Sequence, residues 1–248
     1  MATATDFRQP FLTRYRRSYN ALTDVDTAYQ RLRHDRRRMR TIRAALRVIH
    51  DRGAGRYLGV TLLHRHFRAE PDAVFVERRF TPSARRHATV LVTCQLPVAE
   101  TPRRLAPHRF VFTRGGKLQP LEFTTDRAAI HAHAELADDP RLHAEVAGVI
   151  AEGGLDGLLG VGIFARQRSV ARATKVFLEE TRFAERQSVV HVLPRLPAAP
   201  RRLIPTLWTF GATGDLVCET ICLAYCSGHG GSTIGYCGHI RGQHVGKT

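Results

Sequence analysis

Between Gly55 and Phe123 the chain is divided into short apolar segments rich in Val, Leu, Phe and Thr, separated by proline, glycine and charged residues. Segments of this length and composition are typical of β-strands. They are too short to bury a helical face on their own, so a sheet is the fold they favour. The expected strands are Tyr57–His64, Ala73–Glu77, Thr89–Gln95, Arg109–Thr113 and Leu118–Phe123, with Gly115-Gly116 as a hairpin turn before the last.

The residues before this region predict one long helix from about Thr23 to His50. Its apolar residues recur at intervals of three, four or seven, which places them on one helical face. Thr23 or Asp24 can cap the beginning, and Gly53 and Gly55 end the helix. The buried stripe is predicted to consist of Val25, Ala28, Tyr29, Leu32, Met39, Ile42, Leu46 and Ile49.

In the second half of the chain, two helices are followed by a run of strands, so helices and strands do not strictly alternate. An alanine-rich helix is expected from Asp126 to Leu136, and a second helix starts at Asp139-Pro140 and ends at Gly153-Gly154. The fold class is therefore α+β: a long N-terminal helix, a mostly antiparallel sheet and further helices. The remaining expected strands are Gly160–Ala165, Lys175–Leu178, Val189–Leu193 and Ile204–Phe210.

Composition divides the chain into four segments. Residues 1–22 are a basic arm in which Pro10 interrupts any early helix, although aromatic residues recur every four positions from Phe7 to Tyr19. Residues 23–193 form the α+β core domain, and residues 194–206 are a linker or crossover rich in proline and arginine. Residues 207–248 are a C-terminal segment rich in glycine, cysteine and histidine, which could pack on the core.

The chain is strongly basic, and the charge is unevenly distributed. Its 248 residues carry a formal charge of +16, and 14 arginines against 5 aspartates in residues 1–56 account for +9 of it. Such clusters bind nucleic acids, anionic membrane surfaces or acidic partners, or are simply a solvated face. The arginines of the long helix predicted to make these contacts are Arg31, Arg33, Arg37, Arg38 and Arg40.

The five cysteines and the first twenty residues bear on the compartment. An odd number of cysteines and the lack of an apolar core in residues 1–20 predict reduced thiols and a cytoplasmic location. The arginines and aromatic residues of that segment leave organelle targeting as an alternative. No apolar run is long enough to cross a bilayer.

The main candidate site lies in the C-terminal segment. Cys226 and His229 form one close pair of soft ligands, and Cys237 and His239 form another, with glycines between them that let the backbone fold tightly. Thiolate and imidazole are ligands that zinc or iron accepts in a tetrahedral site. The leading hypothesis is therefore a metal-binding protein, with catalysis left open.

Cys222 could replace one of these histidines, depending on local structure. Cys218, Cys222 and Cys226 are four residues apart, so neighbours could share an ion on a helix but lie roughly 13 Å apart on a strand. Alternatively Cys218 and Cys222 are small core residues. A third hypothesis makes Cys226 or Cys237 the nucleophile of a metal-free enzyme, with a histidine as base.

Two further histidine pairs have spacings that matter. His64 and His66 end an expected strand and share one face, which suits two ligands of one metal or a catalytic base and its partner. The competing interpretation is one packed and one exposed histidine. His131 and His133 lie in a helical segment and point to opposite faces, and adjacent Glu179 and Glu180 would do the same on a strand.

Overall fold

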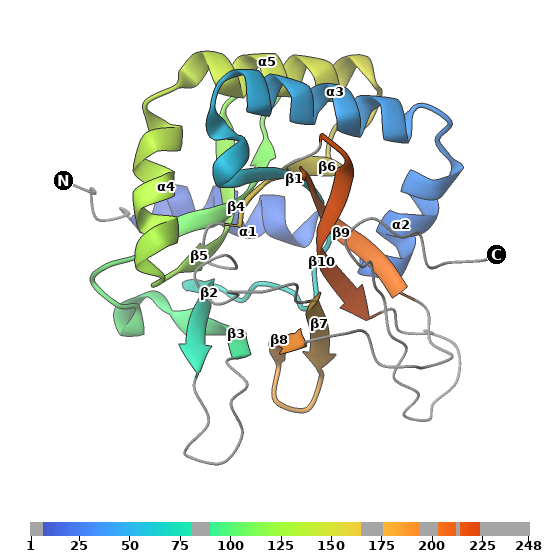
Figure 1. The fold of residues 1–248 in the computed structure, drawn as a ribbon. Helices are drawn as coiled ribbons and strands as arrows, with labels where there is room; N and C mark the ends of the chain where they lie inside the picture. The colour runs from blue at the N-terminus through green and yellow to red at the C-terminus, as the bar shows by residue number, and fades with distance from the viewer. Residues whose placement is uncertain (1–6, 81–89, 165–175, 194–202, 212–213, 224–248) are drawn as a thin grey trace.

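The computed structural model describes residues 7–80, 90–164, 176–193, 203–211 and 214–223. In these ranges, ten strands form one closed barrel and five α-helices pack around it (Figure 1). The helices are α1 (Gln9–Asn20), α2 (Val25–His34), α3 (Arg38–Asp51), α4 (Arg127–Ala137) and α5 (Pro140–Glu152), with short 3-10 turns η1 (Ala54–Arg56) and η2 (Val98–Glu100). The strands are β1 (Leu58–Leu62), β2 (Ala73–Phe80), β3 (Val90–Pro97), β4 (Ala106–Phe112), β5 (Leu118–Thr124), β6 (Leu159–Ile163), β7 (Val176–Arg182), β8 (Gln187–Leu193), β9 (Leu203–Phe210) and β10 (Leu216–Leu223).

The order around the barrel is β1-β6-β4-β5-β2-β3-β8-β7-β10-β9, and β9 pairs with β1 to close it. Two of the ten pairings, β2 with β5 and β7 with β10, are parallel, and the others are antiparallel. The α+β class and the mostly antiparallel sheet are thus confirmed. Each of the nine expected strands is present, within a few residues at its ends.

The single long helix predicted for Thr23–His50 is wrong, because the chain breaks between α2 and α3. Asp35 caps the C-terminus of α2 in an extended conformation, and its side chain accepts a hydrogen bond of 2.6 Å from the backbone N–H of Arg37. An aspartate that bonds its own neighbouring backbone competes with the helix. The predicted cap is present at the other end, where Asp24 accepts a hydrogen bond of 2.8 Å from the N–H of Thr27.

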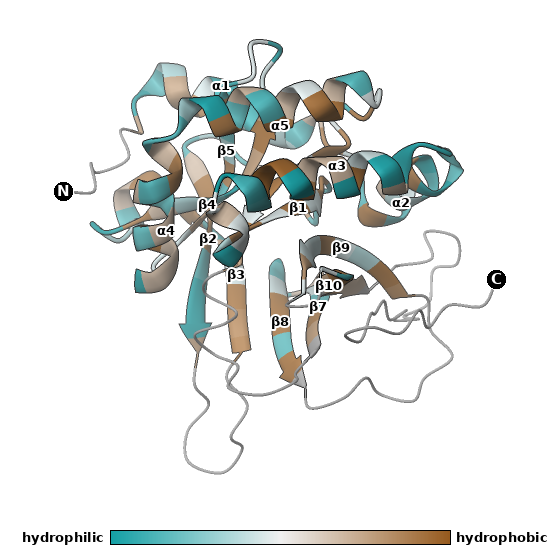
Figure 2. Ribbon diagram, turned by 45° about the horizontal axis from the view of Figure 1, so that its top comes forward, coloured by the Kyte–Doolittle hydropathy of each residue, from teal (hydrophilic) through white to brown (hydrophobic). Residues whose placement is uncertain are grey.

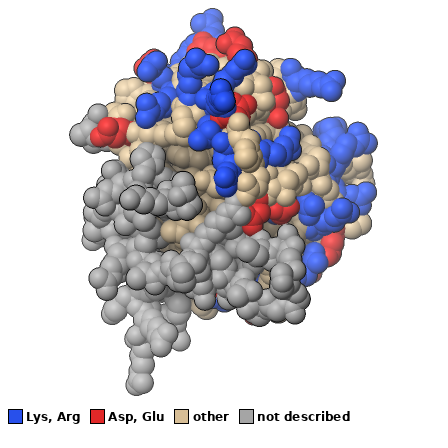
Figure 3. Space-filling model, turned by 90° about the vertical axis from the view of Figure 1, so that its right-hand side faces the viewer, with Lys and Arg blue, Asp and Glu red and all other residues tan. Residues whose placement is uncertain are grey.

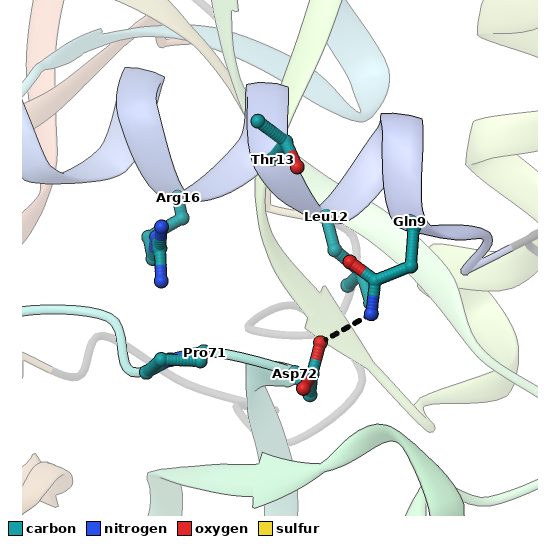
Figure 4. A pocket seen from close by; sticks show the side chains of 6 residues that line it. All are labelled: Gln9, Leu12, Thr13, Arg16, Pro71 and Asp72. Atoms are coloured by element: carbon teal, nitrogen blue, oxygen red, sulfur yellow. Dashed lines mark hydrogen bonds between the residues drawn. The ribbon is translucent and has the colours of Figure 1, made fainter.

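Residues 9–20, within the expected basic arm, form helix α1. Pro10 occupies its first turn, where its missing N–H removes no helical hydrogen bond, so the expected interruption is wrong. The fourfold aromatic spacing buries Tyr15 and Tyr19 against the barrel, where the Tyr15 hydroxyl donates to the Leu121 carbonyl at 2.9 Å. At the start of α1, Gln9 donates a hydrogen bond of 2.7 Å to Asp72 in the segment before β2 (Figure 4).

The other helices cover the barrel with their apolar faces. In Figure 1, α3 and α5 lie side by side across one end, and Figure 2 shows hydrophilic residues on their outer surfaces. Ile42, Leu46 and Ile49 of α3 are almost completely buried, as the predicted stripe requires. None of the helices in the described residues is long and apolar enough to cross a membrane.

The barrel also includes residues from the expected linker and C-terminal segment. Strand β9 begins at Leu203, inside the range assigned to the linker, and pairs with β1 and β10. Residues 216–223, left open between helix and strand, form strand β10. The described part of the C-terminal segment therefore belongs to the same barrel as the core domain.

Candidate metal centre

Four potential metal ligands meet in the barrel from three distant parts of the chain. His64 and His66 follow the end of β1, Glu179 lies on β7, and Cys222 lies on β10. Each residue offers one donor atom, and these four atoms all lie within 4.8 Å of one another. All four side chains are buried, including that of His66, which is only 5% exposed.

The pairing of strands explains how Glu179 and Cys222 come together. They are register partners in the parallel pair β7 and β10, so their side chains point to the same side of the sheet. On that side, Thr181 and Ser188 are also partners, and both are buried. The inner side of these strands is therefore partly polar, unlike the apolar core beneath α3 and α5.

His64 is fixed in the orientation of a metal ligand. Its Nδ1 lies 2.9 Å from the carbonyl oxygen of Leu62, so Nδ1 carries the proton and Nε2 keeps a lone pair. Nε2 is buried and has no hydrogen-bond partner in the described part of the chain. Burial, helped by the nearby His66 and Arg109, lowers the pKa of His64 to about 3, so the ring stays neutral, as a ligand must.

His66 is held in the same way. Its Nδ1 lies 2.6 Å from the hydroxyl of Thr181, and its Nε2 lies 3.1 Å from Oε1 of Glu179. The two imidazole rings are almost perpendicular, with centroids 4.9 Å apart. Metal-binding histidines usually have their second ring nitrogen bonded to an oxygen, and both histidines show that arrangement.

Glu179 is an ionised carboxylate with several partners. Oε1 accepts a hydrogen bond of 2.7 Å from Ser188, and Oε2 lies 3.8 Å from the guanidinium of Arg109. Burial alone would raise the pKa of Glu179, but His66 and Arg109 outweigh it and lower the pKa well below its usual value. Glu179 is therefore charged and ready to bind a cation.

Arg109 links this cluster to a second buried carboxylate. On β4, it donates a hydrogen bond of 3.0 Å to Glu122, its register partner on β5. Burial alone would lower the pKa of Arg109, but Glu122 and Glu179 raise it, so the guanidinium remains charged. One arginine thus lies between two carboxylates inside the barrel.

The separations of the donor atoms can be compared with those of a tetrahedral zinc site. Zinc bonds of 2.0–2.3 Å imply distances of about 3.3–3.8 Å between neighbouring donor atoms. The separation of His66 Nε2 from Glu179 Oε1 is already 3.1 Å, and the widest separation in the cluster is 4.8 Å at most. The donor atoms are thus about as far apart as the ligands of one ion, or somewhat farther.

The structure describes only some of the residues of the site expected from sequence. His64 and His66 are brought together and both side chains are buried, so the interpretation of one packed and one exposed histidine is wrong. Cys222 joins them, whereas Cys218 lies four residues away on the same strand and cannot share an ion with it. The expected ligands of the C-terminal segment, Cys226, His229, Cys237 and His239, lie outside the described residues.

Glu179 was not among the expected ligands, and one signal could have found it. In the β7 sequence, Phe177, Glu179 and Thr181 alternate with Leu178 and Glu180, so the inner face combines an apolar residue with polar ones. Glu180 points the other way, as expected, and lies 2.9 Å from Nε2 of His191.

The second histidine pair contributes nothing to the cluster. His131 is exposed on α4, while His133 is half-buried and stacks on Phe110 with ring centroids 6.0 Å apart. Their opposite directions match the helical spacing.

No family model, curated protein or solved structure matches this chain.

Proposed function

We propose that the protein binds one divalent transition-metal ion, zinc or iron, through His64, His66, Glu179 and Cys222. The observation that carries this proposal is the convergence of four buried donor atoms within 4.8 Å, one of them the bare Nε2 of His64. A buried polar nitrogen without a partner costs free energy, and a bound ion would remove that cost.

The charges of the cluster favour a divalent ion. Glu179 and a Cys222 thiolate would balance two positive charges, while Arg109 and Glu122 balance each other. An imidazole that donates a lone pair to an ion adds no charge of its own to this balance. A site with this balance avoids an uncompensated buried charge, which would be strongly unfavourable.

The ligand types narrow the choice of metal. Magnesium and calcium prefer sites made of oxygen ligands alone, whereas a thiolate with two imidazoles suits zinc or iron. Four protein ligands fill a tetrahedral zinc site, and closed sites of this kind stabilise a fold. The ion would therefore tie the end of β1 to β7 and β10, and catalysis would require one ligand to give way to water.

The proposal is tested by metal analysis of untagged protein purified under reducing conditions without chelator. We expect about one equivalent of zinc or iron in the wild type and loss of that ion in Cys222→Ser and His64→Gln. The matched control is Cys218→Ser, because Cys218 is also buried on β10 but lies four residues along the strand from Cys222, too far to share its ion. Chelation of the wild-type protein should release the same equivalent and lower its melting temperature.

A double variant, Cys226→Ser with Cys237→Ser, separates this proposal from a site in the C-terminal segment. Retention of the ion by that double variant supports the barrel site. Retention by Cys222→Ser with loss in the double variant would overturn it. A wild-type protein without metal would overturn both sites and direct attention to thiol reactivity.

A further inference from the structure

Helices α2 and α3 carry a basic surface that the metal site does not use. Residues 25–52 contain nine arginines and three aspartates, and no acidic residue stands between Asp35 and Asp51. Figure 3 looks at the side of the molecule on which α2 lies, and Lys and Arg side chains gather over its upper part. The expected partner-binding arginines lie here: Arg31 and Arg33 on α2, Arg37 just before α3, and Arg38 and Arg40 on α3.

These arginines differ in how their side chains are engaged. Arg38 is half-buried and donates a hydrogen bond of 2.9 Å to the carbonyl oxygen of Asp35. Arg40, Arg43 and Arg47 are exposed and form no ion pair with any residue that the structure describes. The charge of α3 is thus left uncompensated within the described fold.

Arg40, Arg43 and Arg47 lie along one side of α3. Their spacing of three and four residues puts them on neighbouring turns, about 10 Å from first to last at 1.5 Å per residue. Together with Met39 and Ala44 they line a shallow hollow of about 320 Å³. The hollow therefore presents a row of guanidinium groups above a small apolar floor.

We propose that this row, named here the α3 arginine row (Arg40, Arg43 and Arg47), binds the phosphate backbone of a nucleic acid. Guanidinium groups pair with phosphate oxygens through two parallel hydrogen bonds, and a line of them matches a line of phosphates. A membrane surface fits less well, because the large apolar residues Ile42, Leu46 and Ile49 of α3 face the core, which leaves only the small apolar floor of the hollow to insert into lipid. Phosphate contacts do not read bases, so the binding is independent of sequence.

The test is the affinity for a labelled duplex of mixed sequence, about 20 base pairs long, measured by fluorescence anisotropy between 50 and 200 mM salt. The test variant combines Arg40→Gln, Arg43→Gln and Arg47→Gln. The matched control combines Arg14→Gln, Arg16→Gln and Arg17→Gln, which removes the same charge from exposed positions on α1. All six substitutions are at exposed sites, and thermal melting checks that both proteins remain folded.

We expect the α3 variant to lose at least about tenfold in affinity for the duplex. Each lost phosphate contact lowers the slope of log K against log salt by about 0.9, so the loss of three contacts should make the slope shallower by about 2.7. The α1 variant should keep the wild-type slope. Equal losses in both variants would overturn the proposal, because they would show only the effect of net charge. The proposal would also be overturned if the protein did not bind the duplex, or if it bound polyglutamate as tightly as the duplex. Binding to phosphatidylserine vesicles instead of the duplex would overturn it too.

Discussion

Glu179 and Cys222 are direct register partners on the parallel strands β7 and β10. They are 43 residues apart in the chain, and β8 and β9 lie between them in sequence. The parallel pairing of β7 with β10 brings the two side chains together. A metal ion held by both would stabilise that long-range pairing, and this is the main consequence of the proposed site for the fold.

The buried arginine provides a test of the electrostatics around the site. Arg109→Met leaves Glu122 and Glu179 without their shared cation, so we expect the free energy of unfolding to fall by about 3–5 kcal/mol. Urea unfolding measures this loss. Arg182→Met is the control, because Arg182 is 43% exposed and 3.8 Å from Glu180, and an exposed pair contributes about 0–1 kcal/mol. Equal losses in the two variants would contradict the account.

The half-buried His133 predicts how stability depends on pH. Burial, together with the nearby His143, lowers the pKa of His133, so the unfolded chain binds more protons at this residue below about pH 6.5. The contribution of His133 to stability is complete above that pH and falls as the pH drops towards the folded pKa. His133→Gln should weaken the decline in melting temperature below pH 6.5, whereas His131→Gln, at an exposed position two residues away, should leave it unchanged. If the melting temperature of His133→Gln declined below pH 6.5 as steeply as that of the wild type, His133 would not be responsible for the decline.

A close approach of backbone in the barrel predicts a strong effect of one methyl group. A Cβ at Gly160 on β6 would overlap the carbonyl oxygen of Phe110 and lie 2.7 Å from Cδ2 of Leu63, the residue before His64. Gly160→Ala should therefore cost about 1–3 kcal/mol or more and weaken metal binding by shifting His64. Gly148→Ala is the control, because a Cβ there meets nothing within 4 Å on α5, and it should stabilise the helix by up to about 1 kcal/mol. Unfolding of both variants in urea compares them.

The local elements were predictable from sequence because their signals are local. The Asp24 cap, the helix starts at Asp126 and Asp139, and the Gly115-Gly116 turn are short-range patterns, and the structure contains each of them. The break at Asp35 was missed because the apolar stripe continues across it with helical spacing. That stripe reports burial, and two helices at an angle can bury it as well as one.

The pairing of strands and the complete site were beyond the reach of local patterns. The spacing of His64 and His66 predicted two imidazoles on one face, and the structure brings the two rings together, but nothing near them in sequence indicated Glu179 or Cys222. The order of strands in the barrel decides which residues become neighbours. Strands β7 and β10 are adjacent in the barrel, although β8 and β9 lie between them in the sequence. A site assembled in this way becomes visible only once the strands are paired.

The most direct test of the metal site is X-ray absorption spectroscopy of the metal in wild-type protein, which counts sulfur ligands. The barrel site predicts about one sulfur at 2.3 Å and three nitrogen or oxygen ligands at 2.0–2.2 Å. A site of Cys226, His229, Cys237 and His239 would give two sulfurs and two nitrogens. One sulfur, lost together with the ion in Cys222→Ser, is the result that we expect. Two sulfurs, or a shell without sulfur, would contradict the site of His64, His66, Glu179 and Cys222.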